Sequence, residues 1–184
     1  MELVWPAEEH LASYVDALRR GWSPDTMRPV AAQEQLARIA ADRALFIFQQ
    51  VDREAKGPPV VLPDGRTAIR IPGYHRWMWD GEFSGVINFR WQPGTTALPP
   101  HCLGHIGYSV VPWKRGRGYA KKALELLLPD AKQEGLEFVE LTTDAENIAS
   151  RKVIEANGGT LIEHFNKPEA YGGAEGLRYR IALR

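Results

Sequence analysis

The sequence contains little cysteine and no long apolar segment. The only cysteine, Cys102, can form neither an intrachain disulfide nor a thiolate zinc cluster. No apolar run approaches the about 18 residues that a membrane-spanning helix requires. The first residues, MELVWPAEEH, lack the basic and then apolar pattern of a signal peptide. We therefore expect a cytoplasmic protein with no membrane partner and no bound metal.

An excess of charge of either sign is also absent. Lys and Arg total 23, Asp and Glu total 23, and the formal net charge is zero. A neutral chain lacks the broad positive potential that attracts nucleic acids or anionic membranes. The composition is ordinary for a globular protein, with 44% hydrophobic and 25% charged residues in 184 positions. We therefore expect one domain over residues 1–184 and no nucleic-acid partner.

The spacing of apolar residues predicts both helices and strands. Residues 67–91 indicate an antiparallel hairpin, with Asp80 and Gly81 at its turn. A hairpin that leads into a strand–helix–strand–helix–strand unit favours a mixed α/β fold. The other predicted helices cover 7–20, 30–42, 117–133 and 147–157, and the other predicted strands cover 45–51, 105–112, 136–144, 159–165 and 177–183.

A basic segment with two glycines joins the predicted strand 105–112 to the helix 117–133. Gly116 and Gly118 allow a sharp turn, and the first N–H groups of the helix point outward as anion donors. The segment predicts a diphosphate site. It is not a P-loop, and Lys121 occupies the position of the third glycine in a dinucleotide fingerprint. The alternatives are a basic turn that only caps the helix and a nucleic-acid-binding segment. The basic side chains expected to add positive potential are Lys114, Arg115, Arg117, Lys121 and Lys122.

Two motifs resemble those of the GNAT superfamily of acetyltransferases. The segment RGRGYA, Arg115–Ala120, matches the family signature [QR]-x-x-G-x-[GA], and Asn147–Gly159 resembles the family's N-x-x-[AS] helix. The similarity is strong over 80–165, weak over 1–65, and nearest the branch of the ribosomal-protein N-acetyltransferases. It implies a mixed α+β fold: a central, mostly antiparallel twisted sheet with a splayed parallel strand pair and helices on both faces. The core over 80–165 would bind acetyl-CoA, and the helices of 1–65 would face the acceptor.

The resemblance also implies where acetyl-CoA, the cosubstrate, binds. The strands 105–111 and 136–143 should start side by side and then splay, with the pantetheine arm between them. The Val110 N–H would stabilise the negative charge that develops on the acetyl oxygen. Asn147 would contact the pantetheine arm, or it could serve only as the helix N-cap. The residues implied to hold the cofactor are Ser109, Val110, Val111, Arg115, Gly116, Arg117, Gly118, Tyr119, Ala120 and Asn147.

The resemblance leaves the general acid and base open. Many family members carry a tyrosine seven residues after the asparagine, where this chain has Ile154. Ser150 is the next candidate for the acid, as in the ribosomal-protein branch, and its alternative is a plain helix-surface serine. Glu82, His101 and His105 are candidates for the base. His105 begins the cofactor strand and has a suitable ordinary pKa, but it could instead be a structural histidine bonded to backbone.

These features favour an N-acetyltransferase that transfers an acetyl group to a primary amine by direct attack in a ternary complex. The acceptor would be a small-molecule or peptide amine, and the protein a monomer or homodimer. A catalytically inactive, acyl-CoA-sensing module is the alternative, which Ile154 permits. Thiol release from acetyl-CoA in the presence of amines separates these two functions. Nucleic-acid binding is disfavoured because the chain is neutral and lacks a basic stripe.

Overall fold

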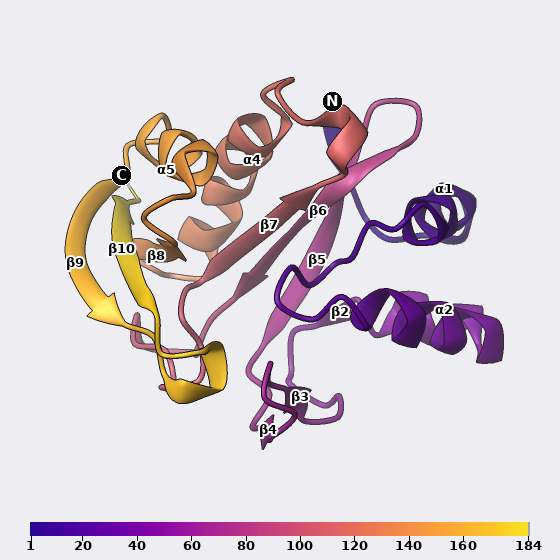
Figure 1. The fold of residues 1–184 in the computed structure, drawn as a ribbon, viewed down its shortest axis with the longest axis horizontal. Helices are drawn as coiled ribbons and strands as arrows, with labels where there is room; N and C mark the ends of the chain where they lie inside the picture. The colour runs from indigo at the N-terminus through magenta and orange to yellow at the C-terminus, as the bar shows by residue number, and fades with distance from the viewer. Residues whose placement is uncertain (184) are drawn as a thin grey trace.

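The computed structural model describes residues 1–183 and has the expected mixture of helices and strands (Figure 1). Three helices lie near the start of the chain, strands predominate over residues 51–110, and helices and strands alternate after that. The elements are β1 (Glu2–Val4), α1 (Glu8–Arg19), α2 (Ala31–Ala41), α3 (Arg43–Phe48), β2 (Val51–Asp52), β3 (Val60–Val61), β4 (Thr67–Ala68), β5 (Gly73–Trp79), β6 (Phe83–Arg90), β7 (Ile106–Val110), α4 (Tyr119–Gln133), β8 (Phe138–Thr143), α5 (Ile148–Glu155), β9 (Thr160–Asn166) and β10 (Glu175–Ala182).

Two antiparallel sheets meet at one corner. The first has the strand order β1-β5-β6-β7, with β2 also paired to β5, and the second has the order β8-β10-β9. They join where the His105 N–H donates to the Glu140 carbonyl at 2.7 Å. Beyond this contact no ladder connects β7 to β8 in residues 1–183. The two strands therefore start together and then separate, as the resemblance implied.

Helices cover both faces of the first sheet, because neighbouring residues of a strand point to opposite sides. Trp77 and Val86 pack into an aromatic-rich cluster with α1, α2 and α3. Met78 and Ile87 point the other way and pack into a largely aliphatic cluster with α4, α5 and the second sheet. This second cluster extends continuously through both sheets. The expected hairpin of β5 and β6 thus forms the centre of the molecule (Figure 1).

The predicted strand over 45–51 is wrong, because residues Arg43–Phe48 form helix α3 instead. The Asp42 carboxylate accepts a hydrogen bond from the Leu45 N–H at 2.9 Å and so caps the helix. Phe46 alone of these residues is buried, and Phe48 is 76% exposed. An N-cap and one buried anchor therefore outweigh the β propensity of this short apolar run.

Two further findings concern membrane-spanning helices and metal sites. Within residues 1–183, no helix combines the length and the apolar character needed to cross a bilayer. Over the same range, no three His, Cys, Asp or Glu side chains gather in a way that would hold a metal ion.

Candidate functional site

A groove of about 670 Å³ lies between the end of β7, the start of α4 and the start of α5. We call it the α4 groove. Val111 and Arg117, both predicted to hold the cofactor, do not line it, whereas the other predicted cofactor residues do. Ser150 lines it as well. The predicted residues that line the groove are Ser109, Val110, Arg115, Gly116, Gly118, Tyr119, Ala120 and Asn147.

The backbone at the head of α4 suits an anion. Gly116 and Gly118 both have φ of 76°, in the left-handed region that other residues enter at a cost of about 1–2 kcal/mol. Gly118 is the N-cap and offers no side chain, and the Lys122 N–H makes the bond to its carbonyl at 3.0 Å. The N–H groups of the first turn therefore have no helical acceptor and are available to a ligand.

Lys114 lines the α4 groove, but two carboxylates balance its charge there. Its side chain is 4% exposed, and its ammonium contacts Asp80 at 2.5 Å and Glu82 at 2.9 Å. Tyr119 donates to the other oxygen of Asp80 at 2.6 Å. Burial opposes ionisation of Asp80, but the hydrogen bonds from Lys114 and Tyr119 outweigh it and hold the pKa of Asp80 below its usual range. This ion pair therefore links the β5–β6 turn, which contains Asp80, to the segment before α4, which contains Lys114.

A second hollow, of about 290 Å³, occupies the space where β7 and β8 separate. We call it the β7–β8 gap. Tyr108, Asn147 and Ser150 line both the gap and the α4 groove, so the two spaces adjoin. Ligand atoms entering from the head of α4 would reach the separated strand edges along this route.

The free edge of β7 carries the Val110 N–H, and Val110 lines the α4 groove where it adjoins the gap. Val111 donates to the Ser84 carbonyl on β6 at 3.0 Å, and successive N–H groups of a strand alternate in direction. Val110 therefore points its N–H away from β6. Opposite it stands Gly85, where a Cβ would lie 2.4 Å from the Ser109 carbonyl oxygen. The close approach of β6 to β7 requires glycine at position 85, a feature that the sequence analysis missed.

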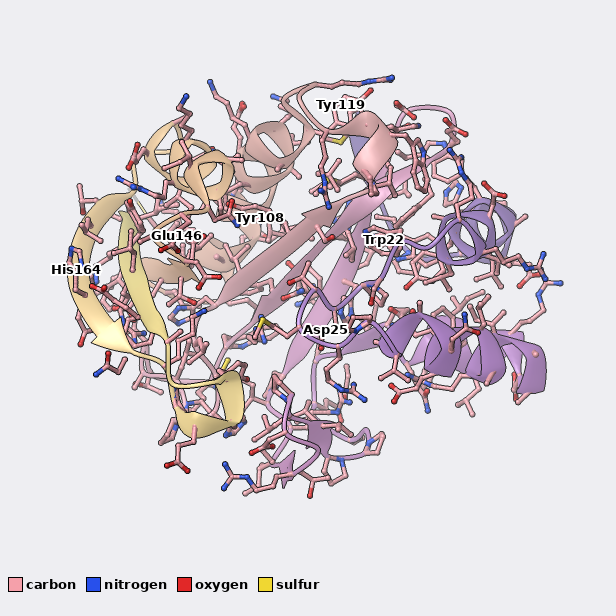
Figure 2. The ribbon with its side chains drawn as sticks, viewed as in Figure 1. Trp22, Asp25, Tyr108, Tyr119, Glu146 and His164 are labelled. Atoms are coloured by element: carbon pink, nitrogen blue, oxygen red, sulfur yellow. The ribbon has the colours of Figure 1, made fainter. Side chains whose placement is uncertain are left out.

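A pair of hydroxyls lies beside this strand edge. The Tyr108 and Ser150 hydroxyl oxygens are 2.8 Å apart, and Tyr108 points from β7 toward α5 (Figure 2). Burial raises the pKa of Tyr108 to about 12, which the hydrogen bond with Ser150 only partly offsets. Ile154 is 1% exposed and packs in the core. The sequence analysis identified Ser150 but not its partner, since the two residues lie 42 positions apart.

Asn147 serves as the N-cap of α5, one of the two roles considered for it. Its Oδ1 accepts a hydrogen bond from the Ser150 N–H at 3.0 Å. The cap uses only the amide oxygen, and the amide nitrogen can donate to a ligand at the same time. Since Asn147 lines both the groove and the gap, capping and ligand contact are compatible.

His105 lies at the junction of the two sheets and is fully buried. Its Nδ1 accepts a hydrogen bond from the Glu140 N–H at 2.9 Å, next to the backbone bond that joins β7 to β8. Burial lowers the pKa of His105 to about 4, although the nearby Glu140 carboxylate raises it in part. The imidazole is therefore neutral at pH 7. It lies at the junction from which β7 and β8 diverge.

The N-terminal region also reaches the gap. Trp22, which follows α1, donates from its indole Nε1 to the Ser109 hydroxyl at 3.0 Å (Figure 2). Thr26 lines both the groove and the gap, and Met27 lines the gap. The loop between α1 and α2 thus forms part of the site.

Comparison with known proteins identifies relatives of this fold, although no curated protein is significantly similar in sequence. One similar structure is an acetyltransferase from Salmonella typhimurium that modifies the N-terminal serine of 50S ribosomal subunit protein L7/L12. It has 16% identity and a TM-score of 0.63, with coverage of 99% of this chain and 94% of that chain. Another is the microcin C7 self-immunity acetyltransferase MccE in complex with acetyl-CoA and AMP. It has 13% identity and a TM-score of 0.60, with coverage of 98% and 91% respectively.

A third similar structure is RimL, the ribosomal L7/L12 α-N-protein acetyltransferase, in complex with coenzyme A. It has 17% identity and a TM-score of 0.61, and the match covers 98% of this chain and 93% of that chain. At these identities the structures establish the fold. The family model described as "Acetyltransferase (GNAT) domain" matches residues 3–160, most of the sequence. The chain therefore belongs to the GNAT acetyltransferase family.

Proposed function

We propose that the protein is an acetyl-CoA-dependent N-acetyltransferase that transfers the acetyl group to a primary amine by direct attack in a ternary complex. One observation carries this proposal: the α4 groove is lined both by the head of α4, with its free N–H groups, and by Val110, and it adjoins the β7–β8 gap. Anion binding and an oxyanion donor therefore lie along one continuous path. Acetyl-CoA would supply a thioester-activated acetyl group and a thiolate leaving group with a pKa of about 8.5.

The head of α4 would hold the diphosphate of the cosubstrate. Its free N–H groups and the helix dipole favour negative charge, and the exposed side chains of Arg115, Arg117 and Lys121 add positive potential. Further along the groove, the Asn147 amide nitrogen and the free edge of β7 offer hydrogen bonds to the pantetheine arm. The same edge supports our assignment of Val110 as the oxyanion donor, a contribution worth about 3–4 kcal/mol in well-studied acyl transfers.

The Tyr108–Ser150 pair would assist departure of the thiolate. At neutral pH Tyr108 retains its proton, because its pKa is about 12. The hydroxyl pair can therefore donate a hydrogen bond to the leaving sulfur. Full proton transfer from these hydroxyls to a thiolate would be uphill, since the thiol is much the stronger acid. The pair would instead relay to the sulfur the proton that the attacking nitrogen loses as the amide forms.

We assign His105 a positioning role instead of the role of general base. The histidine is buried and neutral, and its Nδ1 already accepts from Glu140. Without a dedicated base, the reaction favours acceptors that are readily deprotonated. At pH 7 an α-amine loses its proton at a cost of about 1 kcal/mol, whereas a lysine side chain requires about 4–5 kcal/mol. A peptide N-terminus or a small α-amine is the acceptor that fits this chemistry.

Thermal unfolding with and without acetyl-CoA tests the proposal first. At a ligand concentration about 100-fold above the dissociation constant, the folded protein should gain about 2.7 kcal/mol. Thiol release should then appear when amines are added. An unchanged melting curve would contradict the assignment of the groove. Protection without thiol release from any α-amine would favour the acyl-CoA-sensing alternative.

A further inference from the structure

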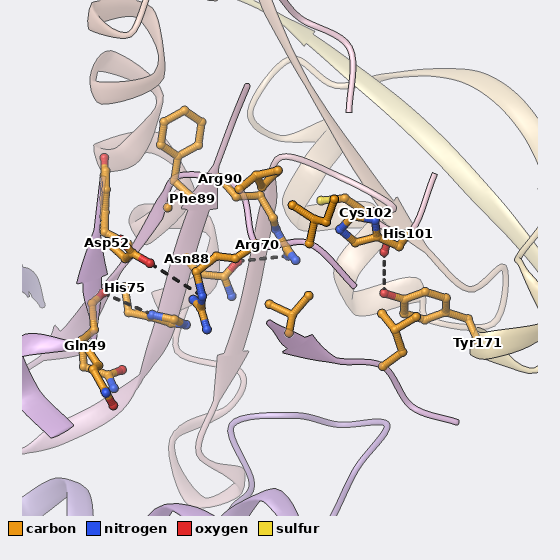
Figure 3. A pocket seen from close by; sticks show the side chains of 17 residues that line it. Gln49, Asp52, Arg70, His75, Asn88, Phe89, Arg90, His101, Cys102 and Tyr171 are labelled. Carbon is orange, nitrogen blue, oxygen red and sulfur yellow. Dashed lines mark hydrogen bonds and ion pairs between the residues drawn. The ribbon is translucent and has the colours of Figure 1, made fainter. Parts of the chain in front are cut away.

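A third hollow, of about 220 Å³, lies over the ends of β5 and β6 on the face of the sheet opposite α4 (Figure 3). We call it the polar hollow. It adjoins the β7–β8 gap, because Arg90 and Tyr171 line both spaces. The proposed reaction does not use it. The residues that define it are Asp52, Arg70, His75, Asn88, Arg90 and Tyr171.

Arg90 lacks the partner that comparable arginines have. Arg76, Arg90 and Arg180 each have a buried Nε that makes no hydrogen bond within the described chain. Arg76 and Arg180 lie 3.7 Å and 2.7 Å from a carboxylate oxygen. In residues 1–183 no carboxylate lies within 4 Å of Arg90, whose guanidinium donates to the Asn88 side chain at 3.1 Å. Arg90 is partly buried, and withdrawing a cation from water without a counterion is costly, so this position is suited to an anionic ligand.

The surroundings leave the charge of Arg90 unbalanced. Arg70, the other cation of the polar hollow, lies 3.6 Å from Asp52 and is neutralised by it. Burial lowers the pKa of His75 to about 4, so this ring is neutral at pH 7. The polar hollow therefore carries one uncompensated positive charge, located on Arg90.

A glycine keeps the space between Arg90 and β7 open. At Gly107, a Cβ would lie 3.2 Å from the Arg90 guanidinium and 3.3 Å from the Asn88 amide. Gly107 precedes Val110 by three positions on β7, which is about 10 Å along a strand. An anion on Arg90 would thus lie about 10 Å from the proposed oxyanion donor, the span of two to three extended peptide residues.

We infer that Arg90 selects acceptors by binding a carboxylate, and that the acceptor is a peptide with an acidic side chain two or three residues after its reacting amine. This inference rests on the proposed function, which places the reacting amine of the acceptor next to the Val110 N–H. A guanidinium suits the carboxylate because its planar N–H groups can donate to both oxygens at once. The α-carboxylate of a free amino acid is too close to its own amine to span this distance.

Two peptides that differ in one charge provide the test. Calorimetry would measure binding of Ala-Ala-Glu-Ala-amide and Ala-Ala-Gln-Ala-amide to the protein saturated with coenzyme A. The wild type should bind the glutamate peptide at least about tenfold more tightly, as expected for a charge-assisted hydrogen-bonded pair. Arg90→Gln should remove this discrimination. Arg70→Gln, the matched control, should retain it, because Arg70 is already paired with Asp52.

Binding separates this inference from the proposed function, because it needs no catalysis. Discrimination by the wild type without acetylation of either peptide would support the anion site and count against the transferase. Acetylation of both peptides with equal affinity would support the transferase and overturn the role of Arg90. No measurable binding of either peptide, or discrimination that persists in Arg90→Gln, would also overturn it. Unchanged coenzyme A affinity and melting temperature would show that Arg90→Gln is folded.

Discussion

The α4 groove lies at the end of β7 and the polar hollow lies over the ends of β5 and β6, and the two are built in different ways. The groove takes its anion donors from the backbone of one continuous segment, Arg115–Lys121, whose glycines fix its shape. The polar hollow takes its one free charge from the Arg90 side chain, and segments distant in sequence surround it. The comparison shows that a site built from backbone is recognisable in a local motif. A site built from side chains becomes visible only when the topology is known.

Substituting a glycine at each end of α4 should give the largest effect. Gly118 and Gly135 both have positive φ, 76° and 83°, and a Cβ at either position would meet no atom within 4 Å. Gly118→Glu and Gly135→Glu therefore impose similar backbone strain of about 1–2 kcal/mol. Only Gly118→Glu places a carboxylate at the head of the helix, where it would repel the diphosphate. Calorimetry should show coenzyme A affinity reduced by more than about 100-fold in Gly118→Glu. Wild-type affinity in this variant would locate the phosphate site elsewhere.

Substitution of Gly85 tests the proposed role of the Val110 N–H as the oxyanion donor. In Gly85→Ala the new methyl would collide with the Ser109 carbonyl at 2.4 Å and push β7 away from β6. A displaced Val110 N–H should lower kcat by about 10- to 100-fold, less than complete loss of such a donor. Gly81→Ala is the control, because its Cβ would meet no atom within 4 Å in the β5–β6 turn. An equal loss in both variants would indicate a general effect on the hairpin.

The hydroxyl pair should contribute less. Ser150→Ala and Tyr108→Phe should each lower the acetyl-transfer rate by about tenfold or less, since a thiolate leaves readily. If the two hydroxyls act as a unit, the double variant should lose little more than either single variant. Coenzyme A affinity should stay unchanged. Single-turnover measurements are needed, because product release can mask the chemical step. Fully additive losses would show that the hydroxyls act separately.

His105 lies at the junction of the two sheets, away from both the groove and the polar hollow, and its replacement should have the smallest effect on rate. In His105→Asn the amide oxygen can still accept from the Glu140 N–H, so we expect kcat within about threefold of wild type. A loss of 10²–10⁴-fold, typical of a missing general base, would contradict the positioning role. His105→Phe, which lacks the acceptor, should be less stable than His105→Asn at pH 7.

The same histidine should make stability depend on pH. The folded protein resists protonation of His105 down to about pH 4, whereas the unfolded chain takes up the proton near pH 6.5. Stability should therefore fall as the pH drops from 6.5 to 4, by up to about 3 kcal/mol from this residue. His105→Asn should lose that part of the pH dependence in urea unfolding curves. His75, whose pKa is also lowered to about 4, would still contribute its share.

Features that depend on neighbouring residues could be predicted from the sequence, whereas features that depend on residues far apart in the chain could not. The hairpin, α4 and α5 follow from turn residues and apolar spacing, and the helix-head glycines follow from a contiguous motif. The strand predicted at 45–51 failed because the Asp42 cap outweighs the propensity of the residues after it. The Tyr108–Ser150 pair, the burial of Lys114 and the isolation of Arg90 depend on long-range register, which single-sequence patterns do not encode.

The hydrogen bond from Trp22 to Ser109 has a practical consequence for protein engineering. Trp22 is 2% exposed and also packs edge-on against Phe83, so one end of the loop before α2 is anchored to the central sheet. The other end enters α2 at Ala31, which is buried as well. Residues 23–30 therefore form a cassette between two fixed points. Libraries with this cassette randomised, and Trp22 and Ala31 kept, would test whether the loop selects the acceptor while β7 stays unchanged.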